Sequence, residues 1–236
     1  RSRVGKLMSS GQNSSYGRFV RSPIRIWDLP TRVFHWLLVA LLAAAWYTAE
    51  QGPIEWHAWI GQTLLALIVY RLIWGLVGSE TARFRHFVKG PKAVLGYFRG
   101  LPSRETAPAV GHNPLGGLMV IVLLGLVATQ ATLGLFANDD IYFDGPLRHL
   151  VSKDTSDTLT GLHHQVFDLI LIAAAIHVAA AVFYLIYKRE NLIGAMFTGK
   201  KRLPPPDPRL RFVPAWRALP VLAAAAALVW AAVTYL

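Results

Sequence analysis

The chain has 236 residues, of which 54% are hydrophobic and only 16% charged, and the apolar residues gather into long blocks typical of membrane proteins. Cysteine is absent, which excludes iron–sulfur clusters, Cys-based zinc sites, disulfides and covalent haem attachment through CxxCH. A net charge of +11 would suggest nucleic acid binding in a soluble protein, whereas in a membrane protein the first question is which loops carry the charge.

The chain opens with a basic tail, residues 1–23, that is rich in Ser and Gly and that we expect to lack fixed structure. We expect no cleavable signal peptide, because the first 30 residues contain no uninterrupted apolar stretch. Asp28 followed by Pro30 is a helix-start signal, and it precedes the first apolar block.

Five apolar blocks are long enough to cross a hydrocarbon layer of about 30 Å. They cover residues 31–50, 55–77, 114–136, 162–187 and 214–236. We predict an all-α integral membrane fold, with a four-helix transmembrane bundle over residues 24–200. A proline-rich connector, 201–213, contains PPPDP as a stiff spacer and leads to a fifth, accessory transmembrane helix over 214–236. This last helix contains no histidine, so we expect it to face lipid or a partner subunit.

Basic residues are distributed very unevenly. Seven Lys and Arg lie at or before the start of the first span, six in the loop after the second, and eight between the fourth and the start of the fifth, which is 21 of 24. The positive-inside rule therefore predicts a cytoplasmic N-terminus and a periplasmic C-terminus in a bacterial inner membrane. The outer segments carry seven acidic residues against two basic ones, a net charge of −5. That favours a basic periplasmic partner, although translocated loops also lose basic residues for topological reasons alone.

Four histidines lie at membrane depth, where polar groups are costly and usually functional. His163 and His177 are 14 residues apart on one predicted helix, so they share a face to within roughly 40° and differ in depth by about 21 Å. His35 lies near the cytoplasmic start of the first span and His57 near the outer start of the second. The topology therefore pairs His57 with His163 and His35 with His177, as ligands of two six-coordinate haems at two depths.

Arg71 lies 14 residues after His57 and repeats its face one level deeper. A buried guanidinium there could bind a propionate of the inner haem, or could instead extend to the cytoplasmic headgroups. Glycines near the histidines could admit a flat macrocycle or serve close helix packing; they are Gly61, Gly117, Gly125 and Gly134.

The remaining histidines are predicted to be peripheral. His86, His112 and His149 fall in loops or at a span edge, where a solvated imidazole costs little. His164 adjoins His163 but fits the shared face less well, and Asp168 one turn on could accept its N–H. Four unrelated histidines, as in a transporter or proton pathway, remain the alternative to a haem constellation.

At these residues the sequence resembles the bacterial di-haem cytochrome b561 family, which includes the cytochrome b subunits of nickel–iron hydrogenases. The motifs are RIWDLPTRVFHW, WHAWIG, YRLIWGLVGS, GHNPLGG, TGLHH and AIHVAAAVFYLIYKREN, spread over residues 24–200. The resemblance implies that His35, His57, His163 and His177 ligate two haems b, and that the protein conducts electrons between a periplasmic redox protein and membrane quinone. The fifth span departs from the family's four-helix pattern.

The leading functional hypothesis is therefore transmembrane electron transfer, as the electron-transfer subunit of a multi-subunit oxidoreductase in a respiratory chain. The expected partners are membrane lipid, quinone, and a periplasmic c-type cytochrome or membrane-associated dehydrogenase. Arg71, His86 and His112 are polar groups that could lie near quinone at the cytoplasmic end. Two alternatives stay open: a haem-containing anchor of a larger complex, and a self-contained oxidoreductase for a small donor at the acidic loop 138–145.

Other functions have little support in the sequence. No phosphate-binding glycine motif follows a strand, and neither HExxH nor a serine nucleophile motif is present. The basic segments contain few aromatic residues and are predicted to face the anionic inner leaflet, so we interpret them as topology determinants and expect no nucleic acid binding.

Overall fold

The computed structural model describes residues 22–103 and 108–236; the predicted tail 1–23 lies outside this part of the chain except for its last two residues. Five helices are long and apolar enough to cross a membrane, as predicted. They are α1 (Leu29–Gln51), α2 (Ile54–Val77), α5 (Pro114–Gly134), α6 (Lys153–Ile186) and α8 (Ala218–Tyr235), the last preceded by a short 3₁₀ turn, η3 (Ala215–Arg217). The predicted cap of the first span is confirmed, because the Asp28 carboxylate accepts a hydrogen bond from the Thr31 N–H at 2.8 Å.

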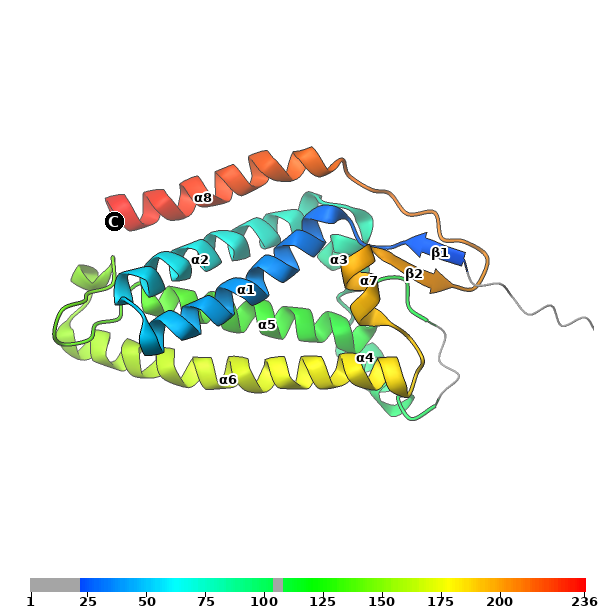
Figure 1. Ribbon diagram of the computed structural model, residues 1–236, viewed down its shortest axis with the longest axis horizontal. Coiled ribbons are helices and arrows are strands. Elements are labelled where there is room, and N and C mark those ends of the chain that lie inside the picture. Colours follow the sequence, from blue (N-terminus) through cyan, green and yellow to red (C-terminus); the bar gives the residue numbers. More distant parts are fainter. Residues whose placement is uncertain (1–21, 104–107) are drawn as a thin grey trace, which may run out of the picture.

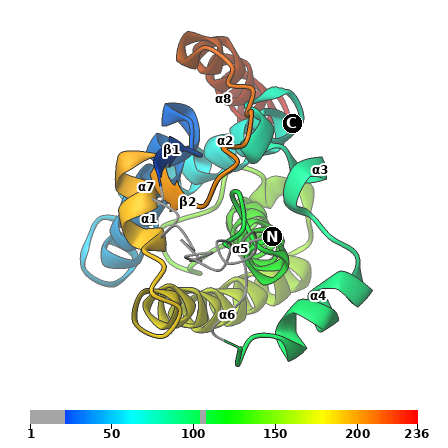
Figure 2. The same ribbon diagram turned by 90° about the vertical axis from the view of Figure 1, so that its right-hand side faces the viewer.

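The long helices lie side by side and nearly parallel, with α8 on the outside (Figure 1). Helix α1 packs on α2, α2 on α5, and α5 on α6, while α8 packs along the other side of α2. The end view in Figure 2 shows α6 and α8 on opposite sides of the bundle. The main hydrophobic core follows α2, with Leu67, Ile68 and Trp74 almost fully buried.

Helix α6 begins nine residues earlier than the hydropathy pattern predicted, at Lys153 instead of residue 162. The Ser152 hydroxyl caps it by accepting from the Thr155 N–H at 3.2 Å, and Asp154 in its first turn favours the positive end of the helix dipole. This polar extension carries no hydropathy signal, so only its capping residues could have indicated it.

The end of the bundle opposite the α1–α2 connection is closed by short elements. These are η1 (Glu80–Ala82), α3 (Phe84–Phe87), α4 (Pro91–Arg99) and α7 (Leu192–Thr198). A two-stranded antiparallel sheet joins β1 (Ser22–Arg25) to β2 (Lys200–Leu203), with Ser22 opposite Leu203 and Arg25 opposite Lys200. The start of the predicted connector 201–213 is therefore part of a strand, which the sequence did not indicate because its partner is about 175 residues away. A further 3₁₀ turn, η2 (Arg148–Leu150), precedes α6 at the other end.

One face of helix α8 packs on this chain's own α2, and most of its other side chains remain exposed, so contact with lipid or a partner stays a prediction. Ala225 is fully buried and Val229 nearly so, and Ala225 belongs to the main core. The segment before α8 is tied to η1, since Arg211 and Glu80 exchange backbone and side-chain hydrogen bonds at 3.0 Å and the Val213 N–H donates to the Ser79 hydroxyl at 3.0 Å.

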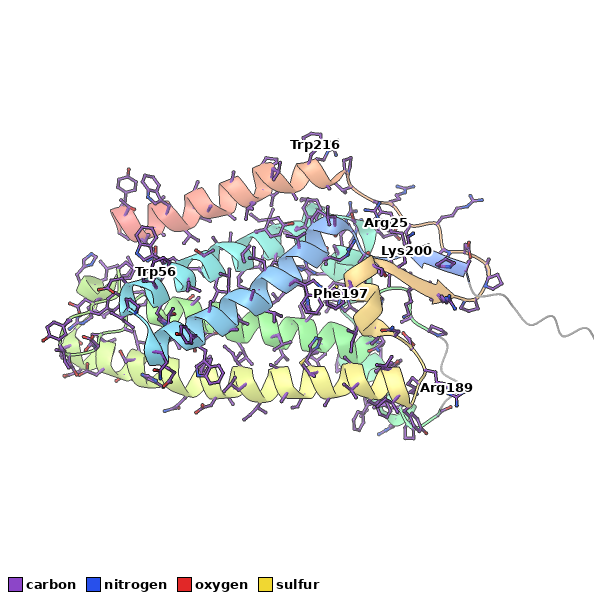
Figure 3. All side chains as sticks on the ribbon, viewed as in Figure 1. Arg25, Trp56, Arg189, Phe197, Lys200 and Trp216 are labelled. Atoms are coloured by element: carbon purple, nitrogen blue, oxygen red, sulfur yellow. The ribbon has the colours of Figure 1, made fainter. Side chains whose placement is uncertain are left out.

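The two ends of the bundle differ in charge. In Figure 3, Arg25, Arg189 and Lys200 lie at the end that carries the small sheet, and Trp56 lies at the opposite end. Trp56 and Trp216 are both mostly exposed, as expected of aromatic residues at the two membrane interfaces. The chain is thus an integral membrane helical bundle.

Candidate functional site

His57 and His163 face each other at the end of the bundle where α1 joins α2. Their ring centroids are 6.0 Å apart, with ring planes at 83°. His57 Nδ1 lies 2.9 Å from the Ala45 carbonyl on α1, and His163 Nδ1 lies 2.9 Å from the Gln130 carbonyl on α5. A carbonyl only accepts, so both Nδ1 atoms must carry the proton, and each ring keeps an Nε2 lone pair free. This is the usual arrangement of a metal-binding imidazole.

Gly134 provides the space for the His163 ring. A Cβ at this position would lie 3.0 Å from Cε1 and 3.4 Å from Nδ1 of His163. Gly117 serves helix packing, because a Cβ there would lie 2.6 Å from the Phe87 carbonyl oxygen. At Gly61 and Gly125 a Cβ would meet no described protein atom within 4 Å, so each of these two positions leaves room for a neighbour other than protein.

His35 and His177 form the second pair, toward the end that carries the sheet. Their ring centroids are 6.3 Å apart and their planes at 52°. No hydrogen bond orients this pair: within the described residues the buried Nδ1 of His35 has no partner. Instead, the His35 ring lies edge-on to Trp36 at 4.9 Å, and Trp36 stacks on Phe197 of α7 at 4.3 Å.

Both centroid distances suit two imidazoles on opposite sides of one metal ion. A metal–imidazole bond of about 2 Å at each side, plus roughly 1 Å from nitrogen to ring centre, gives a separation of about 6 Å. In residues 22–103 and 108–236 no three His, Cys, Asp or Glu side chains gather as a metal site, so each pair offers two protein ligands and leaves the other positions of a metal to a bound group. Helix α6 is not closely packed on α1 or α2, the helices that carry its partner histidines. The residues present therefore fit a flat, iron-containing macrocycle at each pair.

Arg71 lies deep in the bundle and does not extend to the surface. It is 2% exposed, its Nη2 donates to the Ala82 carbonyl at 3.1 Å, and its guanidinium lies 5.0 Å from the Phe84 ring centre. Its Nη1 is buried and has no hydrogen-bond partner in the described chain. A buried unpaired guanidinium donor is costly, so this atom requires an acceptor that the described protein does not supply.

His112, which the sequence predicted to be a solvated loop histidine, is only partly exposed. Its ring lies between Trp27 and Phe87, each with its ring centre 4.6 Å away, and its Nδ1 is buried without a partner in the described residues. Burial, together with the nearby charge of Arg71, lowers the pKa of His112 to about 3. The other two loop histidines are at the surface: His86 Nδ1 lies 3.8 Å from Glu80, and His149 is exposed.

His164 is exposed, and its ring lies edge-on to His163 at 6.2 Å. Across the described chain no hydrogen bond joins it to Asp168, the acceptor that the sequence suggested. The structure thus places His163 inside the bundle and its sequence neighbour outside.

A polar cluster that the sequence interpretation missed lies beyond His177. The hydroxyls of Tyr97 and Tyr184 are 2.7 Å apart, and Asn113 Nδ2 donates to the Tyr184 hydroxyl at 2.9 Å. Tyr184 follows His177 by seven residues, or two helical turns, and therefore lies on the same face. That spacing was a signal in the sequence. Burial raises the pKa of Tyr97, so its hydroxyl stays protonated.

A membrane helical bundle that presents two facing histidine pairs is the architecture of a b-type cytochrome. Residues 26–199 match the family described as prokaryotic cytochrome b561, and the chain belongs to this family. It is similar to the probable Ni/Fe-hydrogenase B-type cytochrome subunit of Rhizobium leguminosarum bv. viciae, with 22% identity over 218 residues, 77% of this chain and 90% of that protein. It is also similar to the probable Ni/Fe-hydrogenase B-type cytochrome subunit of Rhodobacter capsulatus, with 23% identity over 220 residues, 77% of this chain and 82% of that protein. No solved structure matches significantly.

Membership confirms the resemblance found in the sequence. It makes the protein a multi-pass membrane cytochrome that binds haem b, and its function is electron transfer across the membrane. Residues 200–236, which contain β2 and α8, lie outside the matched family segment.

Proposed function

We propose that this cytochrome carries electrons across the bacterial cytoplasmic membrane through two haems b, between a redox partner outside and quinone. His57 and His163 would hold the outer haem, and His35 and His177 the inner one. The observation that carries the proposal is the separation of the ring centroids, 6.0 Å in the outer pair and 6.3 Å in the inner pair. Both values match the about 6 Å expected for trans imidazoles on one metal.

The protein contributes orientation and burial. The carbonyls of Ala45 and Gln130 fix the outer rings so that each presents Nε2, and the 14-residue spacing on α6 sets the two levels. When bound, haem supplies one-electron redox chemistry, whose potential depends on its ligands and surroundings.

The proposed orientation places the N-terminus in the cytoplasm and the C-terminus in the periplasm. It rests on the positive-inside rule, since the basic residues collect around the sheet and the short helices at one end. The His35 and His177 pair is then the inner one.

The outer partner is proposed to be basic, as a periplasmic c-type cytochrome or a dehydrogenase subunit can be. Lys153 forms ion pairs with Asp140 and Asp157, so part of the acidic charge at this end is neutralised within the chain. Asp139 keeps its charge, because three backbone N–H groups lower the pKa of its carboxyl. The named relatives are hydrogenase subunits, which supports membership of a multi-subunit oxidoreductase.

Quinone exchange is proposed at the inner end. The Tyr97, Tyr184 and Asn113 cluster there offers hydrogen-bonding groups on the face of His177. Nearby, between α4 and the end of α6, is an open apolar pocket of about 500 Å³ lined by Phe98, Arg99, Leu101, Pro102, Phe183 and Tyr187. An apolar pocket near convergent polar groups suits a quinone.

The test is a pyridine haemochrome assay on the purified full chain, with the protein concentration measured independently. We expect two haems b per chain. A value of one, or none, would overturn the proposal. If two haems bind but reduced quinone transfers no electrons to them, the anchor function is favoured.

A further inference from the structure

Two buried side-chain nitrogens at the inner end of the bundle have no hydrogen-bond partner in the described chain. Arg71, on α2, uses Nη2 for the Ala82 carbonyl and leaves Nη1 unpaired. His112, just before α5, leaves its Nδ1 unpaired, again counting only partners in residues 22–103 and 108–236. Arg71 is 2% exposed, so water from the surface does not solvate its charge. Buried polar atoms without a hydrogen-bond partner are rare in native proteins and require an explanation.

One aromatic cluster connects the two side chains. The Arg71 guanidinium lies over the Phe84 ring at 5.0 Å, Phe84 lies 5.8 Å from Phe87, and Phe87 lies 4.6 Å from His112. Trp27 covers the other side of the imidazole at 4.6 Å. The Nδ1 atom of His112 is thus buried beside two aromatic rings, while the residue as a whole is partly exposed.

His112 also lies within electrostatic reach of Arg71 and of the inner histidine pair. Besides burial, the groups that lower the pKa of His112 are Arg71 first, then His177 and His35. A neutral His112 can donate one N–H, and Arg71 contributes a permanent positive charge together with its free N–H. We call Arg71 and His112 together the bay, and this pair of side chains is suited to an anion with two acceptor oxygens.

Asp28, the carboxylate that acts on the Arg71 charge, is already engaged by other donors. Asp28 is 1% exposed, but its two oxygens accept hydrogen bonds from the Thr31 N–H at 2.8 Å and from Trp74 Nε1 at 3.1 Å. Asp28 and Arg71 form no direct ion pair in the described chain, although the carboxylate is near enough to act on the Arg71 charge. The described part of the chain therefore supplies no acceptor for Arg71 Nη1.

We propose that Arg71 and His112 together bind a propionate carboxylate of the inner haem, an inference that rests on the proposed ligation by His35 and His177. Arg71 neutralises the carboxylate through a charge-assisted hydrogen bond, and His112 adds a second, neutral one. Both interactions reduce the negative charge that the iron experiences, so together they raise the reduction potential of the inner haem.

The experiment is a redox titration of the purified holoprotein, followed by visible absorption, in which each haem gives one step. Arg71→Gln and His112→Leu each remove a donor from the bay, whereas Arg71→Lys keeps the charge and His112→Gln keeps an N–H. We expect both removal variants to shift the same single step to lower potential, and both conservative variants to recover most of the shift. Arg148→Gln, a change at the opposite end of the bundle, should leave that step where it is.

Three results would overturn the proposal: no step moves, both steps move equally, or the conservative variants shift as far as the removal variants. If Arg71→Gln accumulates without haem, the two His112 variants still test the proposal. His112→Leu should shift one redox step to lower potential, and His112→Gln should recover most of that shift. A wild-type protein with one haem or none refutes the proposed function itself. If the wild-type protein binds two haems but the variants shift no redox step, only the propionate proposal is refuted.

Discussion

The two histidine pairs lie on the same bundle but are held in different ways. The outer rings donate to backbone carbonyls of Ala45 and Gln130 at 2.9 Å, so their orientation is set by the main chain of two other helices. The inner pair has no such bonds in the described chain; the Trp36 ring lies edge-on to His35, and the His112 imidazole lies within electrostatic reach of both rings. A ring fixed by the backbone resists single substitutions nearby. A ring placed by side chains can be adjusted by them, so we expect substitutions at the inner end to change the reduction potential there more readily.

The largest expected effect comes from removing a ligand of the outer pair. In His163→Ala, the facing His57 loses its trans partner, and we expect haem content to fall from two per chain to one. The matched control is His164→Ala, which alters the adjacent exposed imidazole and should retain both haems. Haemochrome assays of the two variants check this. Full haem content in His163→Ala, or halved content in His164→Ala, would contradict the assignment.

At the inner end the largest effect should follow Asp28→Ala. This change removes the cap of α1 and leaves Trp74 Nε1 buried without an acceptor. The expected loss of stability is about 2–4 kcal/mol, from about 1 for the cap and about 1–3 for the unpaired donor. Denaturation in detergent micelles measures it. Asp28→Asn can keep the cap and should lose less, and Asp168→Ala, an exposed aspartate on α6, should lose little. A variant Asp28→Ala as stable as wild type would show that the inner end does not depend on this side chain.

The parts of this molecule that could be predicted from the sequence are those with a local or periodic signal. Hydropathy located all five spans, and the helical period brought His163 and His177 to one face. The direction of each helix through the membrane then predicted that His57 pairs with His163 and His35 with His177. The structure places the two rings of each pair close together.

The rest depends on contacts between distant segments, which no local pattern encodes. The carbonyls that orient the outer rings belong to Ala45 and Gln130, ordinary positions within helices, and any carbonyl in a helix has a second lone pair to offer. His112 looked solvated because it precedes a span, yet Trp27, brought in by the chain before α1, covers it. The pairing of β1 with β2 likewise joins the two segments that flank the matched family region, and it has no local signal.

A smaller effect is expected from Gly134→Ala, which tests whether the outer rings are as rigidly placed as the backbone bonds indicate. The new Cβ would lie 3.0 Å from His163 Cε1, so either the imidazole or α5 must move. Overpacking of this kind costs about 1–3 kcal/mol, and we expect that cost to appear as weaker binding of the outer haem alone. Gly125→Ala, on the same helix, meets no described protein atom within 4 Å. Equal haem retention in the two variants would mean that the His163 ring or α5 can shift without weakening haem binding.

The smallest effect requires no mutation and concerns the ring planes. The outer imidazoles stand at 83° to one another and the inner ones at 52°. In oxidised low-spin haem, more nearly perpendicular axial rings bring the iron d orbitals closer in energy and broaden the spread of the electron paramagnetic resonance signal.

We expect two ferric signals, of which the more anisotropic comes from the outer haem. The loss of that signal in His163→Ala identifies it. Because backbone bonds fix the outer rings, this signal should also keep its shape in His112→Leu, whereas the inner signal should change. If His112→Leu alters the outer signal and leaves the inner one intact, the contrast between a backbone-held and a side-chain-held pair is wrong.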